Sequence, residues 1–546
     1  MTRVQTATTV WRAPSTLLTL VLCTAGLLVG CSREPAGSGQ LTVGVESEFE
    51  RLDPLVLRNP KTLLISAQVF EGLLGLDGAG NIVPGLAEKW DTRDGKVWTF
   101  TLRKNARFHD SWIFGDARSR EVRASDAAWS YMAFCGPGAY GAFVLADIVE
   151  GCGAYSAGKA NSVSGLRVLN ESTLEIELVR PEYAFLHRIT APWLSIFPRE
   201  AARADVKDRW GLDTVVGTGP YRLLSRSATD LELVANPEYW DASRRPAIRT
   251  LKYRVIVNDQ LRLAEFAQQR IDLMQAPGTL TAQILERDGV LKGDLAKTAS
   301  VQVAKTFNSH VLGFNMERIS DANLRRAIGF AIDRRAIVAS LLYGKADISG
   351  GIVPPGLQAY VPPFVVADLY NVQRAKEALE KSNYKGEELE LVVHDQANSE
   401  QIGLIVQEQL KSVGVRVRLT KVDYGTAINK MVKGESPIFS MNFEFGFSSP
   451  DLILLMHFHS KKRPVPNFWQ FTRPEIDAKL DSLSSMADPA SRSTASAEIE
   501  ADIMRDAPGV FMFRQHNLIL LSRKFSNLVV NGHGHFQLEG IRNAAR

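Results

Sequence analysis

Alternating apolar and polar residues mark strands in the first part of the chain. Segments 41–45, 97–102 and 173–178 read LTVGV, VWTFTL and TLEIEL, with apolar side chains at every second position. A period of two places these side chains on one face of a strand. We therefore predict three half-buried strands here, separated by helical segments.

Two of the helical segments lie between these strands. Residues 59–76 carry a helical apolar pattern, and SDAAWSYMAF begins with Ser125, whose hydroxyl suits an N-cap. Farther along, Asp321 is expected to cap a single helix over 322–343 that ends before Gly344, a residue type typical of the position after a helix.

The second half of the chain repeats a helix-then-strand order. A helix from Ser399 ends at Gly414 and passes into the alternating strand 415–422. Residues 509–525 predict a buried strand or pair of strands, after a helix closed by Pro508. Strands interleaved with helices over the whole length predict an α/β fold with mixed sheets.

A strip of three phenylalanines needs a covering partner. NFEFGFSSPDL (442–452) places Phe443, Phe445 and Phe447 at alternate positions before Pro450. Tyr360, Phe468 and Trp469 also lie in segments rich in Pro, Gly and Ser. Clefts that bind organic solutes are lined by such aromatics, whereas core packing is the alternative for each of them.

Composition and motifs exclude several function classes. The chain has 546 residues, 45% hydrophobic and 23% charged, with a well-mixed net charge of +4 that does not indicate nucleic-acid binding. No GxSxG, HExxH or GxxxxGK[ST] motif occurs. The GxGxxG at 136–141 follows a helix and contains Pro137, so we interpret it as a loop.

Histidine and arginine clusters give weak signals of ion binding. The pairs His457/His459 and His533/His535 would share a strand face, but no third ligand lies near either pair, so we expect no metal and no cofactor. Arg325, Arg326, Arg334 and Arg335 are interpreted as a solvated helix face.

The N-terminus resembles a bacterial lipoprotein signal. Arg3 and Arg12 precede the uncharged run 17–29, which is too short to span a bilayer. Leu28 to Cys31 resembles a lipobox, which implies cleavage after residue 30 and a lipid on Cys31; a plain signal peptide is the alternative. Residues 31–40 then form a flexible tether, and the protein faces the periplasm or the cell exterior.

Two further cysteines enter the same oxidising compartment. Cys135 and Cys152 are close enough in sequence to form a disulfide, but two buried thiols remain an equal alternative.

An ordered set of motifs then carries a family resemblance. LDP at 52–54, the long segment 69–110 that begins VFEGLLGLDG, GTGPYRL at 217–223, NPEYW at 236–240 and LRRAIGFAIDRRAI at 324–337 occur in this order. The chain resembles the family 5 extracellular solute-binding proteins, which are the dipeptide, oligopeptide and nickel receptors of ABC importers.

The resemblance implies a two-lobed periplasmic-binding-protein-like fold of type II, of the large three-subdomain kind. Lobe I would cover 41–305, with an inserted subdomain at about 60–190, and lobe II would cover 306–513. Residues 514–546 would return to lobe I. The implied function is a monomeric, non-enzymatic receptor that closes by a hinge on a small organic solute, such as a peptide, and docks on ABC permease subunits.

The strip departs from the pattern of the related peptide receptors. In them an Asp four residues before the Pro takes the peptide's α-ammonium, but here that position is Gly446. Glu444 or Asp451 could supply the carboxylate instead, or the ligand could lack a free amino terminus and be apolar or aromatic. We list as candidate ligand-binding residues Glu46, Tyr360, Phe443, Glu444, Phe445, Gly446, Phe447, Asp451 and Trp469.

Two other functions stay open. A sensor or chaperone-like binding lipoprotein without a transporter would use the same fold, and a neighbouring permease gene would separate it from a receptor. An exported hydrolase is the third, motivated only by scattered His, Asp and Ser residues.

Overall fold

The computed structural model describes residues 39–57, 59–77, 80–363, 369–395, 398–443 and 448–544. The predicted signal peptide, Cys31 and most of the predicted tether lie outside the described residues. The same holds for Glu444, Phe445, Gly446 and Phe447 of the phenylalanine strip. Across the described ranges, no helix has the length and apolar character needed to cross a bilayer.

Lobe I is built on a seven-stranded mixed sheet in the order β12-β19-β11-β1-β10-β9-β8. Strand β1 lies near its centre and pairs in parallel with β10 and β11, while the remaining pairs are antiparallel. The strands are β1 (Gln40–Val45), β8 (Tyr221–Arg226), β9 (Asp230–Ala235), β10 (Thr250–Val255), β11 (Leu273–Ala276), β12 (Ala299–Ala304) and β19 (Asn517–Ser522).

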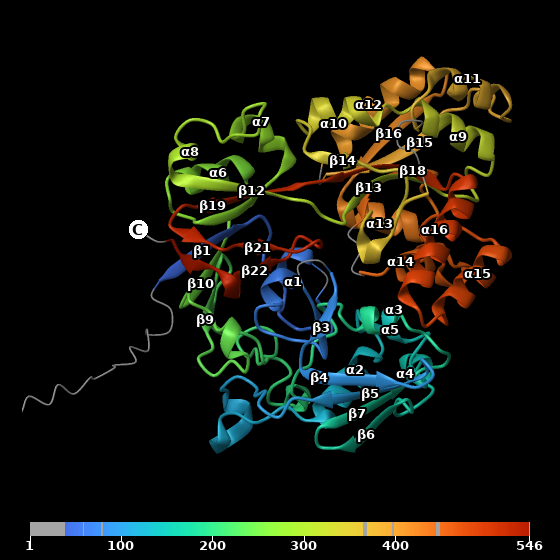
Figure 1. The fold of residues 1–546 in the computed structure, drawn as a ribbon. Helices are drawn as coiled ribbons and strands as arrows, with labels where there is room; N and C mark the ends of the chain where they lie inside the picture. The colour runs from blue at the N-terminus through green and yellow to red at the C-terminus, as the bar shows by residue number, and fades with distance from the viewer. Residues whose placement is uncertain are drawn as a thin grey trace, which may run out of the picture. The chain divides into compact units, whose positions relative to one another are not determined.

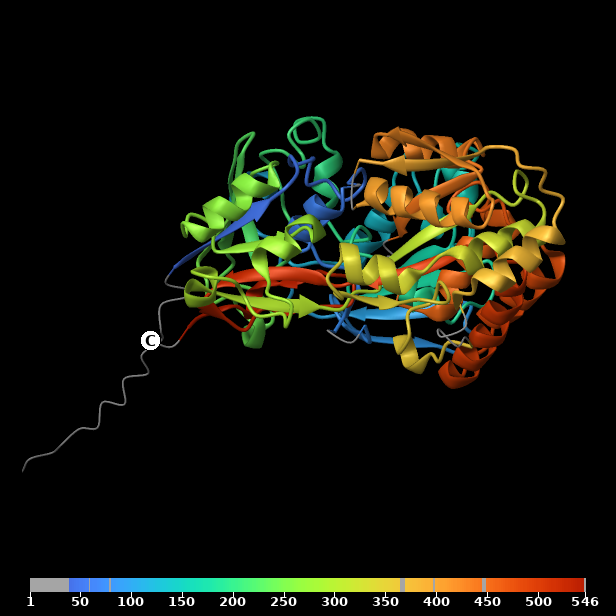
Figure 2. The same ribbon diagram turned by 90° about the horizontal axis from the view of Figure 1, so that it is seen from above.

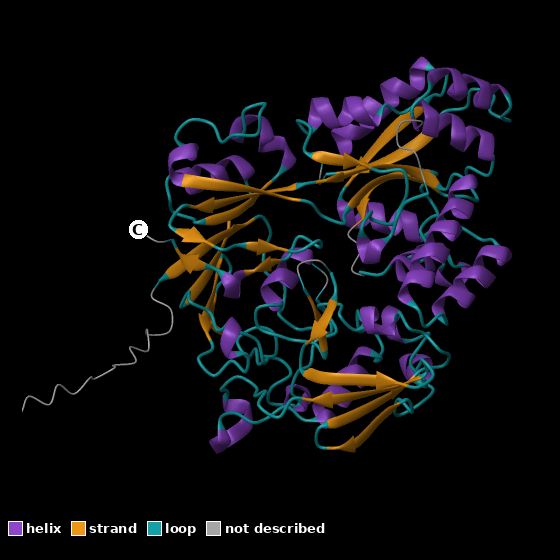
Figure 3. Ribbon diagram, viewed as in Figure 1, coloured by secondary structure: helices purple, strands orange, loops and turns teal. Residues whose placement is uncertain are grey.

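Lobe II is built on a six-stranded mixed sheet in the order β14-β18-β13-β17-β15-β16. Most of the longer helices gather around this sheet (Figure 3). Its strands are β13 (Ser309–Phe314), β14 (Ala346–Ile348), β15 (Leu389–His394), β16 (Val417–Val422), β17 (Ile438–Phe443) and β18 (Gly509–Gln515). Its helices are α9 (Ala322–Ala331), α10 (Arg334–Leu341), α11 (Val372–Glu380), α12 (Ser399–Ser412), α13 (Tyr424–Val432), α14 (Pro450–Phe458), α15 (Pro474–Ser484) and α16 (Pro489–Arg505).

The chain passes between the two sheets twice. It leaves the first sheet after Ala304 and enters the second at Ser309, and it returns between Gln515 and Asn517. The two crossings lie side by side. In the second crossing, β18 and β19 follow one another as one long red segment across both sheets (Figures 1 and 2). The predicted α/β fold with two lobes and mixed sheets is confirmed.

An additional subdomain is inserted between β1 and β8. It holds a four-stranded antiparallel sheet in the order β4-β5-β7-β6. Its elements are β4 (Ala87–Thr92), β5 (Val97–Leu102), β6 (Leu166–Asn170), β7 (Thr173–Glu177), α2 (Ala124–Phe134), α3 (Ala142–Leu145), α4 (Cys152–Ser156) and α5 (Phe185–Arg188). A disulfide joins Cys135, which follows α2, to Cys152 at the start of α4.

Short elements complete lobe I. Small two-stranded pairs are formed by β2 (Leu74–Leu76) with β3 (Ile82–Pro84), β20 (Phe525–Ser526) with β23 (Arg542–Asn543), and β21 (Val529–Val530) with β22 (Phe536–Gln537). The helices are α1 (Pro60–Ser66), α6 (Asp259–Ala267), α7 (Thr281–Ile284) and α8 (Leu295–Thr298).

Alternation along the lobe II strands divides its apolar side chains between two cores. Leu312 and Met512 join a cluster with α9, α10 and α12. Val311 and Phe511, each one residue away, belong instead to the large core that continues through the inserted subdomain into lobe I. This is the expected result of side chains pointing to opposite faces of a strand.

Three local predictions are corrected by the structure. Residues 322–343 form two helices, because Ile332 is extended and the Asp333 carboxylate caps α10 by accepting from Ala336 N–H. Ser125 lies inside α2, whose N-cap is Arg123. Residues 59–76 form only the short α1 followed by β2. The predicted N-cap role of Asp321 is confirmed, since it accepts from Asn323 and Leu324 N–H.

The disulfide should stabilise the inserted subdomain. The bond spans 17 residues, and a closed loop of this length restricts the unfolded chain by about 3 kcal/mol. We expect the double variant Cys135→Ala/Cys152→Ala to unfold at a clearly lower urea concentration, followed by tryptophan fluorescence. An unchanged urea midpoint in the variant would contradict this expectation.

Candidate functional site

Ser448, near the end of the phenylalanine strip, lies where four segments of the chain meet. The Ser448 hydroxyl is 2.7 Å from Nε2 of His533, which belongs to the C-terminal part of lobe I. The ring of Phe307, in the first crossing, packs edge-on against His533 with centroids 5.2 Å apart. A Cβ atom on Gly80 would lie 3.4 Å from the Ser448 hydroxyl. Ser448 therefore lies beside the boundary between the lobes.

Phe443 and Trp469 cover one another. Their rings stack with centroids 5.0 Å apart, and His457 and Phe468 pack around Phe443. Trp469 is fully buried and Phe443 is 7% exposed. In this conformation both side chains contact protein, and Phe443 continues the inward row of β17 that includes Phe439 and Met441.

Tyr360 is held by a buried carboxylate. Its hydroxyl donates to Glu500, which also accepts from Ile352 N–H at 2.6 Å and Val353 N–H at 3.0 Å. Burial raises the pKa of Glu500, while these hydrogen bonds oppose the shift. The phenol thus fixes the loop before residue 363 to α16.

Asp451 already has a cationic partner within lobe II. It lies in the first turn of α14, and its Oδ2 is 3.4 Å from Nε of Arg492. Burial raises its pKa to about 6 although Arg492 favours the charged form. A ligand ammonium would therefore compete with Arg492 for this carboxylate.

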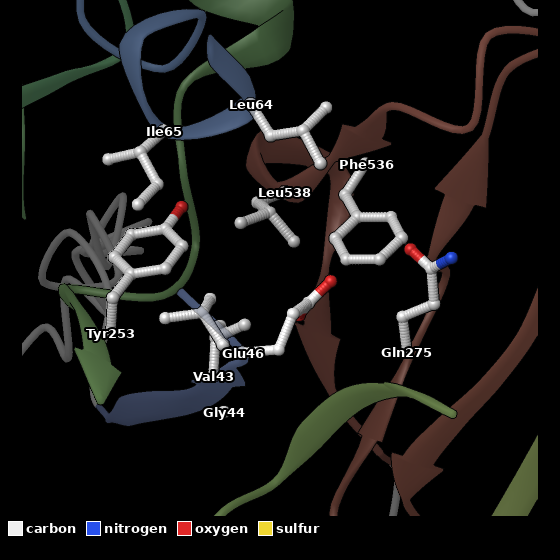
Figure 4. Close-up of a pocket in the computed structure, with 10 residues that line it drawn as sticks. Val43, Gly44, Glu46, Leu64, Ile65, Tyr253, Gln275, Phe536 and Leu538 are labelled. Atoms are coloured by element: carbon white, nitrogen blue, oxygen red, sulfur yellow. The ribbon is translucent and has the colours of Figure 1, made fainter. Parts of the chain in front are cut away.

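Glu46 lines a small cavity in lobe I. The cavity has a volume of about 30 Å³ and lies beyond the end of β1. Figure 4 shows the carboxylate of Glu46 and the amide of Gln275 directed toward the side where the Phe536 ring lies, with Tyr253 on the opposite wall. Its lining residues are Val43, Gly44, Val45, Glu46, Leu64, Ile65, Tyr253, Gln275, Phe536 and Leu538.

The cavity is flanked on two sides by contacts between the lobes. Three residues after Gln275, a Cβ atom on Gly278 would come within 2.8 Å of the amides of Gln515 and Asn398, and Asn398 precedes α12 of lobe II. Three residues before Phe536, His533 contacts Ser448 of lobe II. The cavity therefore lies on the side of lobe I that faces lobe II.

A charged cluster joins the inserted subdomain to lobe II. Lys462 Nζ lies 2.7 Å from Asp147 Oδ2, and Arg188 Nη1 lies 3.4 Å from Asp147 Oδ1. Burial disfavours the charge on Asp147, but Arg188 and Lys462 outweigh it and lower its pKa to about 2. Arg188 is itself buried and paired with Glu182. Such a pair is stable only while each charge keeps its partner.

Uncharged contacts follow the same boundary. Tyr183 N–H donates to the Ser484 carbonyl at 3.1 Å, and the Gln358 side chain hydrogen-bonds to Nε2 of His187. Burial lowers the pKa of His187 to about 3, so that the ring stays neutral at physiological pH. Segment 182–188 thus contacts lobe II at the end of α15 and at the turn that holds Gln358.

The histidine pairs do not assemble a metal site within the described ranges, where no group of three or more His, Cys, Asp or Glu side chains is placed to hold an ion. His457 lies in α14 and His459 follows it, so this pair does not lie on one strand face. Arg325 and Arg334 correct a second expectation, because both are buried and donate to backbone carbonyls.

Sequence reasoning missed several residues at the lobe boundary. Gln275 is a polar residue inside the buried strand β11, and that exception was a usable signal. His533 was considered only as a metal ligand. Asp147 and Lys462 carried no local signal, since their pairing joins positions that are far apart in the sequence.

The family model described as bacterial extracellular solute-binding proteins, family 5 Middle, matches residues 81–464. The dipeptide-binding protein DppE of Bacillus subtilis is 26% identical over 528 residues, which cover 92% of each chain.

Solved structures show the same fold. The Helicobacter pylori DppA complex with the peptide STSA has a TM-score of 0.78 at 19% identity, over 93% of this chain and 98% of that one. The A. tumefaciens R10 protein AgaA in complex with agropinic acid has a TM-score of 0.75 at 21% identity, over 93% and 99%. Together with the family match, which spans most of the chain, these findings confirm the resemblance: the chain belongs to the family 5 bacterial extracellular solute-binding proteins.

Proposed function

We propose that this protein captures an organic solute between its two lobes and delivers it to the permease of an ABC importer. The observation that carries the proposal is the boundary between the lobes, where Ser448 meets His533 beside the Glu46 cavity. Sites between domains that combine apolar walls with a few polar groups are typical of small-molecule receptors. The family name supports solute binding in general terms.

Closure of the lobes would be a hinge motion at the two crossings. The hinge would lie at residues 305–308 and at His516, close to the lobe bounds expected from the sequence, which are 41–305 and 514–546 for lobe I and 306–513 for lobe II. Two adjacent crossings permit the lobes to rotate as bodies while their sheets stay intact. The Lys462–Asp147 pair then stabilises the closed form at the edge away from the crossings.

The solute is proposed to be peptide-like or another organic molecule with an apolar or aromatic part. The related structures are described with a peptide in one case and agropinic acid in another, so the fold accommodates more than peptides. In the sequence, Gly446 stands among three phenylalanines, at the position where related peptide receptors place a carboxylate. The strip therefore favours contact with an apolar group over capture of an amino terminus.

Anchoring and delivery complete the proposal. A lipid on Cys31 would hold the protein at the membrane, and the tether to residue 40 would let it reach a permease. The protein would act as a monomer. A sensor or chaperone-like lipoprotein without a transporter is the alternative, and a permease gene beside this one distinguishes the two.

Binding of a solute is the first expected outcome. Native mass spectrometry of the mature protein, purified without denaturation, should show a bound small molecule, and adding it back should raise the melting temperature in a saturable way. The Ser448 hydroxyl lies 2.7 Å from His533, and a serine–histidine pair is also one part of a hydrolase active site. The mass of the solute is therefore followed over time. A steady loss of the solute with appearance of product would favour hydrolysis over reception.

Closure should depend on Lys462. Lys462→Met keeps the length of the side chain but removes the charge-assisted hydrogen bond to Asp147, worth about 2 kcal/mol. We expect the solute's dissociation constant to rise by tenfold or more. Lys461→Met is the matched control, because Lys461 is exposed. Equal affinities for the two variants would show that this pair does not support closure.

The lipid anchor should depend on Cys31. Cys31→Ser removes the thiol that the lipobox resemblance assigns to lipidation, so the protein should move from the membrane fraction to the soluble exported fraction. Cell fractionation followed by immunoblotting measures this shift. A variant that stays with the membrane in the same proportion would refute the anchor.

A further inference from the structure

The Glu46 cavity lies at the carboxyl ends of parallel strands. Glu46 directly follows β1, and Gln275 lies near the end of β11, the parallel neighbour of β1. Tyr253 comes from β10, the parallel neighbour on the other side. In open α/β sheets, the carboxyl ends of such strands are where ligands bind.

The cavity contains polar groups inside apolar walls. Tyr253 is 3% exposed, and among the described residues its hydroxyl has no hydrogen-bond partner. The Glu46 carboxylate and the Gln275 amide are the other polar side chains in the lining (Figure 4). A buried hydroxyl without a partner costs about 1 to 3 kcal/mol, so a polar group that enters the cavity gains binding energy.

The size of the cavity admits a small group. Its volume of about 30 Å³ exceeds the roughly 10–15 Å³ that one water molecule needs. An ammonium group is about as large as a water molecule, so it fits this space.

The charge of the lining selects the sign of that group. Glu46 carries the only formally charged side chain among the cavity's lining residues. A carboxylate beside apolar walls attracts a cation more strongly than it would in water, and it repels a carboxylate or phosphate. Gln275 and Tyr253 add oxygen atoms that can accept further N–H bonds.

We propose that this cavity receives the protonated primary amine of the solute, with Glu46 as its counter-charge and Gln275 and Tyr253 as its polar neighbours. This inference rests on the proposed receptor function. The solute would be an organic amine with an apolar or aromatic part, and lobe I would hold its amine.

The proposal moves amine recognition from one lobe to the other. The glycine at 446 removes a carboxylate from lobe II, and Glu46 provides one in lobe I from a separate segment of chain. All four polar or aromatic residues that define the cavity, Glu46, Tyr253, Gln275 and Phe536, lie in lobe I. The amine can therefore bind to the open receptor before lobe II closes.

The test compares two dipeptides that differ only at the amine. Isothermal titration is carried out with Phe-Leu and N-acetyl-Phe-Leu on the wild-type protein, Glu46→Gln and Glu48→Gln. Glu48 is exposed and two residues away, so it controls for the loss of a nearby negative charge. The wild type and Glu48→Gln should bind the free dipeptide tenfold to a hundredfold tighter than the acetylated one, and Glu46→Gln should remove that preference.

A second variant and a second readout keep the test decisive. Tyr253→Phe should weaken the free dipeptide severalfold and leave the acetylated one unchanged, and melting curves verify that each variant is folded. In parallel, the solute that co-purifies in native mass spectrometry is treated by reductive dimethylation. A mass shift of the released solute supports the proposal.

Three results would overturn it. One is a preference for the free dipeptide that persists in Glu46→Gln, or that disappears only in Glu444→Gln. Another is equal binding of the two dipeptides, or binding of neither, by the wild type. The third is a co-purified solute without a primary amine. In each case saturable binding of a solute still supports the receptor function, whereas absence of any bound solute counts against both.

Discussion

Glu71 is a buried carboxylate that receives hydrogen bonds from three side chains distant in sequence. Thr218, Tyr239 and Trp240 donate to it at 2.7, 2.8 and 2.9 Å. Burial raises the pKa of Glu71, and the three donors oppose that shift. Since a buried carboxylate is tolerated only when its oxygens are satisfied, this cluster fixes three family motifs to one another. It also fixes the chain that follows α1, the helix that supplies one wall of the cavity.

Lobe II has a similar fixed point in Glu500, so each lobe is held together by its own buried carboxylate. The polar contacts at the boundary are of a different kind, because Asp147 is one-third exposed and can regain water when Lys462 leaves. Interactions that are strong within each lobe and exchangeable between them are what a hinge-closing receptor requires. The motif residues around Glu71 therefore hold one lobe rigid, and they affect the ligand only indirectly.

The strands followed from the sequence because alternation is a local signal, and the two-lobed fold followed from the family resemblance that the ordered motifs carry. The site was only partly accessible, since Glu46, Tyr253, Gln275 and Phe536 are brought together by pairing of β1 with β10 and β11 and by the return of the C-terminal segment. Arg325 and Arg334 were expected on a solvated face because periodicity cannot tell a solvent-facing arginine from one that caps carbonyls. The helix break at Asp333 could not be predicted from the sequence, because aspartate also occurs within helices and does not by itself mark an N-cap.

The position of β19 has a consequence for the order in which the protein folds. This strand, residues 517–522, lies between β12 and β11 in the interior of the lobe I sheet. A chain that emerges from the ribosome, or from a membrane, with its N-terminus first can complete the lobe II sheet once residue 515 is free. The lobe I sheet, by contrast, lacks a strand between β12 and β11 until β19 has been made. Premature termination close to the C-terminus would therefore leave the earliest-made domain unfinished, and the unpaired edges of β11 and β12 would be open to aggregation.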